Sequence, residues 1–209
     1  MPLPRRPLDP AGPGPGPLAR FAGQPGPHSP LRPDPRMRRL QRWYERQLGW
    51  ASVPGRPVRL VVGERFDVLE VPLEAGRAAL ERLAPGVPVA AGSGRMRLLV
   101  AAGGAEELPG ILEWLEWGSL PLDLTAIGTG GLMEAPPPPG HSRAVPTQGA
   151  AVWVRPPEVG CEVEASLPTM SALGGAGHAP DLVRLVDTLA THCHRVRLRS
   201  ARTQALASS

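Results

Sequence analysis

The fold of this chain is decided by a strand-like run near its middle, Phe66-Asp67-Val68-Leu69-Glu70-Val71-Pro72. A second strand-like run with the same character follows at residues 120–127. Each run carries an acidic residue among apolar ones, Glu70 in the first and Asp123 in the second. Because an unpaired buried charge is costly, each carboxylate is expected to face either solvent or a metal ion.

Strand-like and helix-like runs mix along the chain, which predicts an α+β (α/β) fold with a single mixed or antiparallel sheet flanked by helices. Gly92-Ser93-Gly94 separates two apolar runs and predicts a β-hairpin. The glycine-rich residues 128–131 predict a second hairpin between strands at 120–127 and 132–135. Helix-like patterns occupy residues 36–50, 73–83, 105–117 and 182–194.

Composition divides the chain into one domain and two tails. Residues 1–35 are rich in Pro and Gly, and such a segment cannot bury enough apolar surface to offset its ordering entropy. A disordered tail with polyproline II character is expected there, either simply solvated or binding a protein partner in an aromatic-lined groove. Residues 36–195 form the expected domain, and residues 196–209 are expected to be a basic, disordered tail.

The net charge of +4 conceals a strong asymmetry along the chain, in which every basic residue is arginine. Residues 1–59 carry 11 Arg and three acids, residues 60–184 carry eight Arg and 15 acids, and residues 185–209 carry four Arg and one acid. Basic flanks could hold a polyanion by releasing its counterions, whereas an acidic body argues against a broad nucleic-acid groove across the domain. The alternative is that the arginines only form a solvated surface.

Neither a secretory signal nor a membrane span is predicted from the sequence. The N-terminal residues contain no apolar core of a signal peptide, and no run approaches the ~20 apolar residues that a membrane helix needs. Only two cysteines occur, Cys161 and Cys193, which predicts no disulfide framework. A cytoplasmic protein without a membrane partner is therefore expected.

Three segments together resemble a known family. Residues 66–83, which begin with the run quoted above, resemble the first motif region of the bifunctional DNA primase/polymerase (prim-pol) domains of the archaeo-eukaryotic primase superfamily. Residues 87–100 are similar to the strand on which that family carries a catalytic His. Leu122-Asp123-Leu124, Gly130-Gly131-Leu132 and Ala135-Pro136-Pro137 resemble its third motif. Order and spacing agree over residues 42–140.

The departures from the family pattern concern the catalytic groups themselves. The resemblance implies a second acid where this chain has Pro72, and a His where it has Arg97. Glu70 and Asp123 are then vestigial catalytic and metal-binding residues, with Mg²⁺ possible only if some activity remains. The implied protein is a nucleotidyltransferase-like pseudoenzyme whose primase and polymerase chemistry is lost or severely weakened. It would bind DNA or nucleotide through Arg97 and three arginines of the first helix, Arg39, Arg42 and Arg46.

Two alternatives remain open at this point. The chain could be a non-catalytic interaction scaffold that uses its proline-rich tail to bind a protein partner. It could also be an active enzyme in which Asp67 or Glu134 replaces the missing acid. Asp67 lies three residues before Glu70, so on a strand the two side chains face opposite sides of the sheet, which argues against that rescue.

Overall fold

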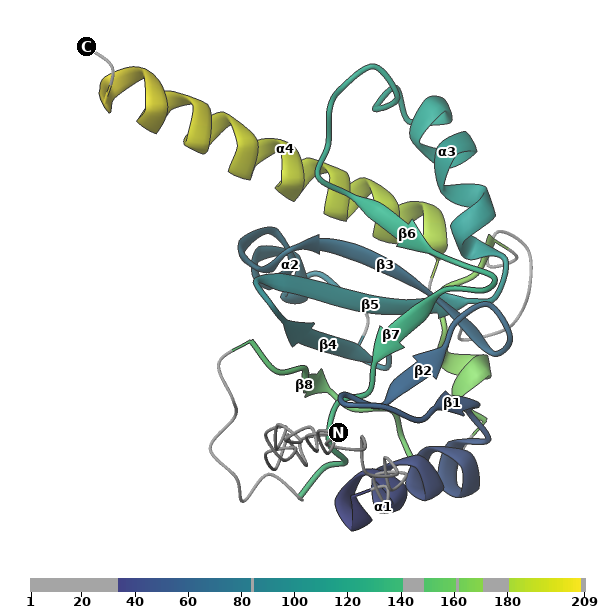
Figure 1. The fold of residues 1–209 in the computed structure, drawn as a ribbon. Helices are drawn as coiled ribbons and strands as arrows, with labels where there is room; N and C mark the ends of the chain where they lie inside the picture. The colour runs from purple at the N-terminus through teal and green to yellow at the C-terminus, as the bar shows by residue number, and fades with distance from the viewer. Residues whose placement is uncertain (1–33, 84, 141–148, 161, 171–180, 208–209) are drawn as a thin grey trace, which may run out of the picture. The chain divides into compact units, whose positions relative to one another are not determined.

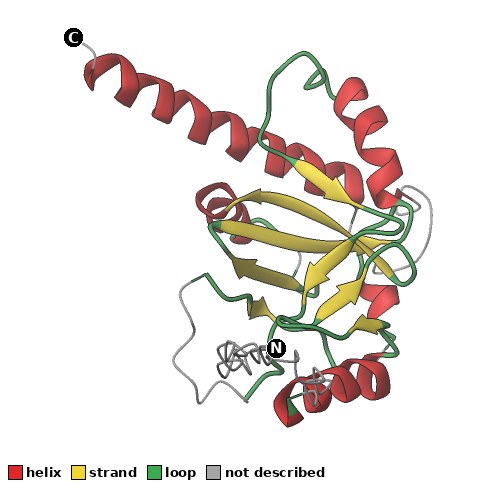
Figure 2. Ribbon diagram, viewed as in Figure 1, coloured by secondary structure: helices red, strands yellow, loops and turns green. Residues whose placement is uncertain are grey.

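The α+β class expected from the sequence is confirmed in the computed structural model, which describes residues 34–83, 85–140, 149–160, 162–170 and 181–207 (Figures 1 and 2). Within these residues the strands form two antiparallel sheets, of five and three strands, rather than the single sheet expected. The predicted disordered tail at residues 1–35 lies outside the described residues except for its last two positions.

The larger sheet has the strand order β6-β3-β5-β4-β8. These strands are Thr125–Ile127, Phe66–Pro72, Arg95–Ala101, Val89–Gly92 and Val152–Arg155. At its centre, β3 and β5 pair antiparallel over seven residues, with Glu70 opposite Arg97 and Pro72 opposite Arg95. The predicted β4–β5 hairpin is confirmed. Its turn residues Ser93 and Gly94 both have positive φ, the geometry of the tight turns that suit a twisted hairpin.

The smaller sheet, in the order β1-β2-β7, corrects the second predicted hairpin. These strands are Ser52–Val53, Arg59–Val61 and Leu132–Glu134. β7 pairs with β2, whereas β6 pairs with β3, so residues 128–131 carry the chain from one sheet to the other. The amide of Gly131 donates to the carbonyl of Gly128 within this turn, and the Gly131 carbonyl then accepts from Val62 beside β2. β7 therefore pairs with the open edge of β2 and not with β6.

The central strand β3 is buried on both of its faces along most of its length, which explains its nearly continuous apolar character. Leu69 and Val71 face a core shared with helices α2 (Leu73–Leu80), α3 (Gly104–Trp114) and α4 (Leu182–Ala207). Phe66 and Val68 face a second core, shared with β2, β7 and the N-terminal helical segment. Alternate side chains of a strand point to opposite faces, so one strand contributes to both cores.

The N-terminal helical segment consists of α1 (Pro35–Trp43) and a π-helical turn, η1 (Tyr44–Leu48). Asp34 caps its start by accepting a hydrogen bond from the Arg36 amide at 2.9 Å. Gly49 ends it with a left-handed backbone, as the position of this glycine in the sequence predicts. The wider π turn places Tyr44 and Leu48 in the second core.

Tyr44 ties this segment to two distant parts of the chain. Its hydroxyl donates to the Pro136 carbonyl at 2.6 Å and accepts from Trp153 Nε1 at 3.0 Å. We expect Tyr44→Phe to lower the free energy of unfolding by about 1–2 kcal/mol, because two largely buried polar groups lose their partner. Urea denaturation at neutral pH measures this change, and Tyr44→Phe unfolding at the same urea concentration as the native protein would contradict it.

The C-terminal helix corrects the predicted tail. α4 spans 26 residues and continues to Ala207, so the prediction of disorder from residue 196 is wrong up to that point. Its first half packs on α2 and α3, and a helix that is already nucleated extends at little further cost. Among the described residues, no helix is both long enough and apolar enough to cross a membrane.

Candidate functional site

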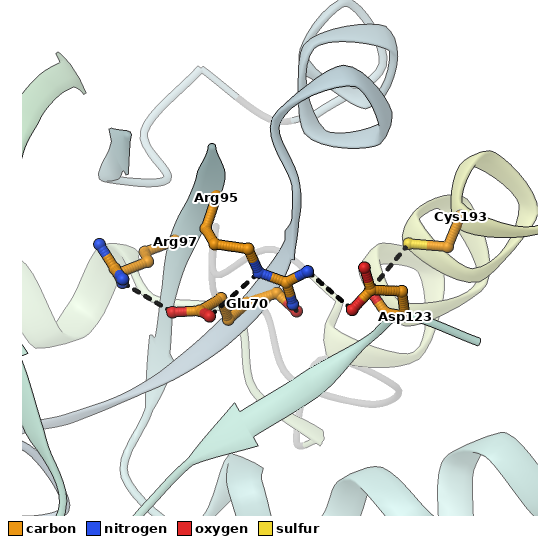
Figure 3. Close-up of polar contacts among 5 residues, drawn as sticks. All are labelled: Glu70, Arg95, Arg97, Asp123 and Cys193. Carbon is orange, nitrogen blue, oxygen red and sulfur yellow. Dashed lines mark hydrogen bonds and ion pairs between the residues drawn. The ribbon is translucent and has the colours of Figure 1, made fainter. Parts of the chain in front are cut away.

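The positions selected from the sequence meet on one face of the larger sheet (Figure 3). Glu70 on β3 and Arg97 on β5 are direct cross-strand partners. Asp123 lies two residues before β6, the strand that pairs with β3 on its other side. The register of three neighbouring strands therefore brings together residues that lie 53 positions apart in the chain.

A residue that the sequence analysis did not select, Arg95, connects the two carboxylates. Its Nε donates to Glu70 Oε1 at 3.0 Å, and its Nη1 donates to Asp123 Oδ1 at 2.7 Å. Its Nη2 donates to the Glu70 carbonyl at 3.3 Å. Arg97 Nε holds the other Glu70 oxygen, Oε2, at 2.7 Å. We call these four side chains, Glu70, Arg95, Arg97 and Asp123, the arginine–carboxylate network.

Burial differs sharply within the arginine–carboxylate network. The side chains of Glu70, Arg95 and Arg97 are 18%, 22% and 16% exposed, whereas that of Asp123 is 62% exposed. Burial works against the charged form of Arg95, but its hydrogen bond and attraction to Asp123, followed by those to Glu70, outweigh burial and raise its pKa. The interactions that matter for stability are therefore those between Glu70 and the two arginines, since exposed ion pairs contribute little.

The structure also places Pro72 and Arg95 next to each other. Pro72, where the resemblance implies a second acid, lies at the end of β3 directly opposite Arg95. A carboxylate at that position would compete with Glu70 and Asp123 for the Arg95 guanidinium. Arg95 could have been found from the sequence, because residues two apart on a strand share a face and Arg97 had already been selected.

Cys193 of α4 contacts the backbone of Asp123. The Cys193 thiol donates to the Asp123 carbonyl at 3.6 Å (Figure 3). Burial, followed by the charge of Asp123, raises the pKa of this thiol to about 12. Cys193 is therefore protonated at neutral pH, which makes it a structural contact and a poor nucleophile.

The two acids considered as replacements for the missing ligand lie elsewhere. Asp67 is fully buried on the opposite face of β3, as its spacing from Glu70 predicts. Its Oδ2 accepts hydrogen bonds from the amides of Gly103 and Ala105, each at 2.9 Å, at the start of α3. Glu134 belongs to the smaller sheet, where its Oε1 accepts from the Ala151 amide at 3.3 Å. Each acid therefore has a structural partner of its own.

The arginines selected on the first helix lie apart from the arginine–carboxylate network. Arg39, Arg42 and Arg46 are all exposed on α1 and η1. Arg42 Nε donates to the Arg38 carbonyl at 3.3 Å, which keeps this side chain along its own helix. The described residues thus present two separate candidate surfaces, one on the sheet and one on the N-terminal helix.

Metal ligands are sparse in the described part of the chain, where no three His, Cys, Asp or Glu side chains gather closely enough to hold an ion. Together, fold and site define an α+β domain whose paired carboxylates are neutralised by arginine. Compared with models of protein families, with curated proteins and with solved structures, the chain matches none.

Proposed function

We propose that this chain is a prim-pol-like domain that binds nucleic acid or nucleotide and does not catalyse nucleotidyl transfer. The observation that carries this proposal is the position of Arg95, whose guanidinium contacts both Glu70 and Asp123. These are the two carboxylates that the sequence resemblance assigns to metal binding. A guanidinium therefore takes the contacts that a metal ion would need.

The charge balance of the site supports the absence of two-metal catalysis. Glu70 and Asp123 supply two negative charges, and Arg95 and Arg97 supply two positive ones. Two-metal nucleotidyl transfer requires carboxylates that bridge ions about 4 Å apart. A divalent ion entering here would have to displace charge-assisted hydrogen bonds of 2.7 Å, on both Glu70 and Asp123, while facing two guanidinium groups.

Binding of a phosphate group is supported by the geometry of Arg97. Only its Nε is engaged by Glu70, and within the described residues its two terminal nitrogens make no hydrogen bond. The guanidinium fork is suited to phosphate oxygens because it can donate two parallel hydrogen bonds. Glu70 fixes the orientation of this side chain, which reduces the entropy that binding would cost.

The row of arginines on α1 and η1 supports contact with a nucleic-acid backbone. Arg39, Arg42 and Arg46 follow one another at helical spacing and are all exposed. Glu45 is the single acid of this helical segment. A phosphate backbone lying along the helix would meet this row with little competition from acidic side chains.

A primer-extension assay with Mg²⁺ or Mn²⁺ tests the catalytic half of the proposal. We expect no synthesis by the native chain and none by Glu70→Ala, since the carboxylates are already neutralised. Robust extension by the native chain that Glu70→Ala abolishes would overturn this half. A purified active polymerase added to the same reaction serves as the positive control.

A salt titration tests the binding half. We expect single-stranded DNA to bind at low salt with an affinity that falls steeply as salt rises, because counterions are released from each phosphate contact. Reversing two charges, in Arg39→Glu with Arg46→Glu, should weaken this binding about tenfold or more. Absence of binding to DNA and to nucleoside triphosphate at low salt would leave the proposal without support.

A further inference from the structure

The C-terminal part of α4 is an unusual surface, because the helix continues there while its side chains become exposed. All 11 residues from 197 to 207 are exposed. Figure 1 shows α4 running on past α2, toward the C-terminus. We call residues 195–207 the α4 arm. At 1.5 Å per residue it is about 20 Å long.

The arm is exposed because the stripe that packs the first half of α4 changes character. Leu185, Leu189, Cys193 and Val196 face the core in the packed half. The same face continues as Ser200, Thr203 and Ala207, which offer no large apolar surface. Nothing in the sequence of the arm therefore requires it to fold back on this domain.

Positive charge accumulates along the arm, which contains no acidic residue of its own. The arm contains Arg195, Arg197, Arg199 and Arg202, and no acidic residue follows Asp187 in the sequence. Like charges three and four residues apart destabilise a helix by repelling each other, and a bound polyanion would remove this repulsion between the arginines. The one ion pair recorded for the described part of the arm joins Arg199 to Glu74 of α2 at 2.7 Å, and both side chains are more than 60% exposed.

The positive strip continues from the arm onto the body of the domain. Arg82, just after α2, places Nη1 3.5 Å from Nε2 of His192. Burial, followed by the charges of Arg195, Arg82 and Arg199, lowers the pKa of His192. A ligand along the first part of the arm, residues 195–202, would therefore meet positive charge, and residues 203–207 carry none.

The distribution of these charges around the helix favours one kind of polyanion. Arg195, Arg199 and Arg202 share one side of α4, because they are spaced four and three residues apart. Arg197 projects from nearly the opposite side, since successive residues turn by about 100°. The major groove of B-DNA admits an α-helix and presents phosphates along both of its walls. An acidic protein helix would need an apolar seam, and the exposed large apolar side chains of the arm are two leucines eight residues apart, Leu198 and Leu206.

We propose that the α4 arm binds the phosphate backbone of duplex DNA by lying in its major groove. This inference rests on the proposed nucleic-acid binding, and it adds a second surface, separate from α1 and from the arginine–carboxylate network. A-form RNA has a deep, narrow major groove that excludes such a helix. Duplex DNA should therefore bind more tightly than duplex RNA of the same sequence.

The test is a titration of the full chain with a 20-base-pair DNA duplex over a range of salt concentrations. Reversing two arm charges, in Arg197→Glu with Arg202→Glu, should weaken binding about tenfold at low salt and reduce the slope against log salt by about 2. The matched control, Arg59→Glu with Arg77→Glu, changes the net charge equally at exposed positions outside the arm. It should weaken binding by less than about threefold. Helical circular dichroism of both variants verifies that they remain folded.

Several outcomes would overturn the arm as a DNA-binding surface. These are equal losses in the arm variant and the control, no loss in the arm variant, equal affinity for duplex RNA, and no binding to the duplex at all. If only Arg39→Glu with Arg46→Glu weakens binding, the proposed function stands and the inference about the arm fails. If only the arm variant, Arg197→Glu with Arg202→Glu, weakens binding, the α1 arginines do not contact DNA and the inference about the arm stands.

Discussion

Glu70→Ala is expected to lower the free energy of unfolding by about 3 kcal/mol, because it leaves two half-buried guanidinium groups without their shared partner. Glu70 accepts from Arg95 and Arg97 on neighbouring positions of one strand face. Breaking a buried ion pair from one side is costly, since the remaining charge stays desolvated and loses its partner. Arg97 loses its carboxylate, whereas Arg95 keeps Asp123 and the backbone carbonyl of residue 70. Here two like charges would also repel each other. Urea denaturation at neutral pH measures the loss.

Asp123→Ala serves as the matched comparison, because it removes the other carboxylate that contacts Arg95. The Asp123 side chain is 62% exposed, so this change should cost less than about 0.5 kcal/mol. The triple variant with Glu70→Ala, Arg95→Met and Arg97→Met should recover part of the stability lost in Glu70→Ala alone, since it removes the unpaired charges. Equal effects of Glu70→Ala and Asp123→Ala would contradict this account of the arginine–carboxylate network.

Asp67→Ala is expected to lower the free energy of unfolding by about 3 kcal/mol as well, through a different mechanism. The fully buried carboxylate joins β3 to the start of α3 by accepting from Gly103 and Ala105. Removing it leaves two amides without their partner and opens a small void beside them. Loss of protection from hydrogen exchange at these two amides would accompany the loss of stability.

The pH dependence of Asp67→Asn tests the same site. Burial of Asp67, with the negative charge of Glu106 nearby, raises the pKa of its carboxyl above the ordinary 3.8. In the range above pH 3.8 the unfolded chain releases this proton before the folded one does, so the native protein loses stability there as pH rises. Asn carries no proton to lose. The stability of Asp67→Asn relative to the native protein should therefore increase from pH 4 to pH 7.

If the stability of Asp67→Asn relative to the native protein instead decreased from pH 4 to pH 7, the two amides would be holding the Asp67 carboxylate in its charged form. Glu106→Gln provides the control, because it removes the neighbouring charge and leaves both hydrogen bonds in place. It should reduce the pH dependence of the native protein without abolishing it, since burial is the larger cause of the raised pKa. Unfolding curves at pH 4, 5.5 and 7 distinguish these outcomes.

Much of the fold follows from local patterns in the sequence. The turn at Ser93 and Gly94 fixes the β4–β5 hairpin, because both residues adopt the positive φ that a tight turn needs. The apolar run of β3 predicts a strand, and its burial on both faces explains why it shows little alternation. These features depend on neighbours in the chain, which is why they can be predicted.

The errors concern choices between competing partners. β6 and β7 each have strand character, but the sequence does not state whether they pair with each other or with β3 and β2. The end of α4 was misplaced because its last residues lack an apolar stripe, although the helix continues through them. Local composition predicts packing better than it predicts helix length.

In the candidate site too, some contacts follow from strand alignment and others depend on residues that are distant in the chain. Pairing of Glu70 with Arg97 follows once β3 and β5 are aligned, and Asp123 comes close to them because β6 pairs with the other side of β3. The spacing from Arg97 is enough to place Arg95 on the same strand face, but its contacts with both carboxylates depend on side-chain geometry that the sequence does not show. Assignment of these residues to nucleotide binding stays a prediction.

The placement of two acids on β3 has a consequence for how the strand is aligned during folding. Asp67 and Glu70 point to opposite faces, and each is held by partners available on that face alone. A slip of one position would invert every side chain of the strand and drive Glu70 into the helical core, away from both guanidiniums. The two carboxylates thus select against the misaligned sheet, whatever ligand the domain binds.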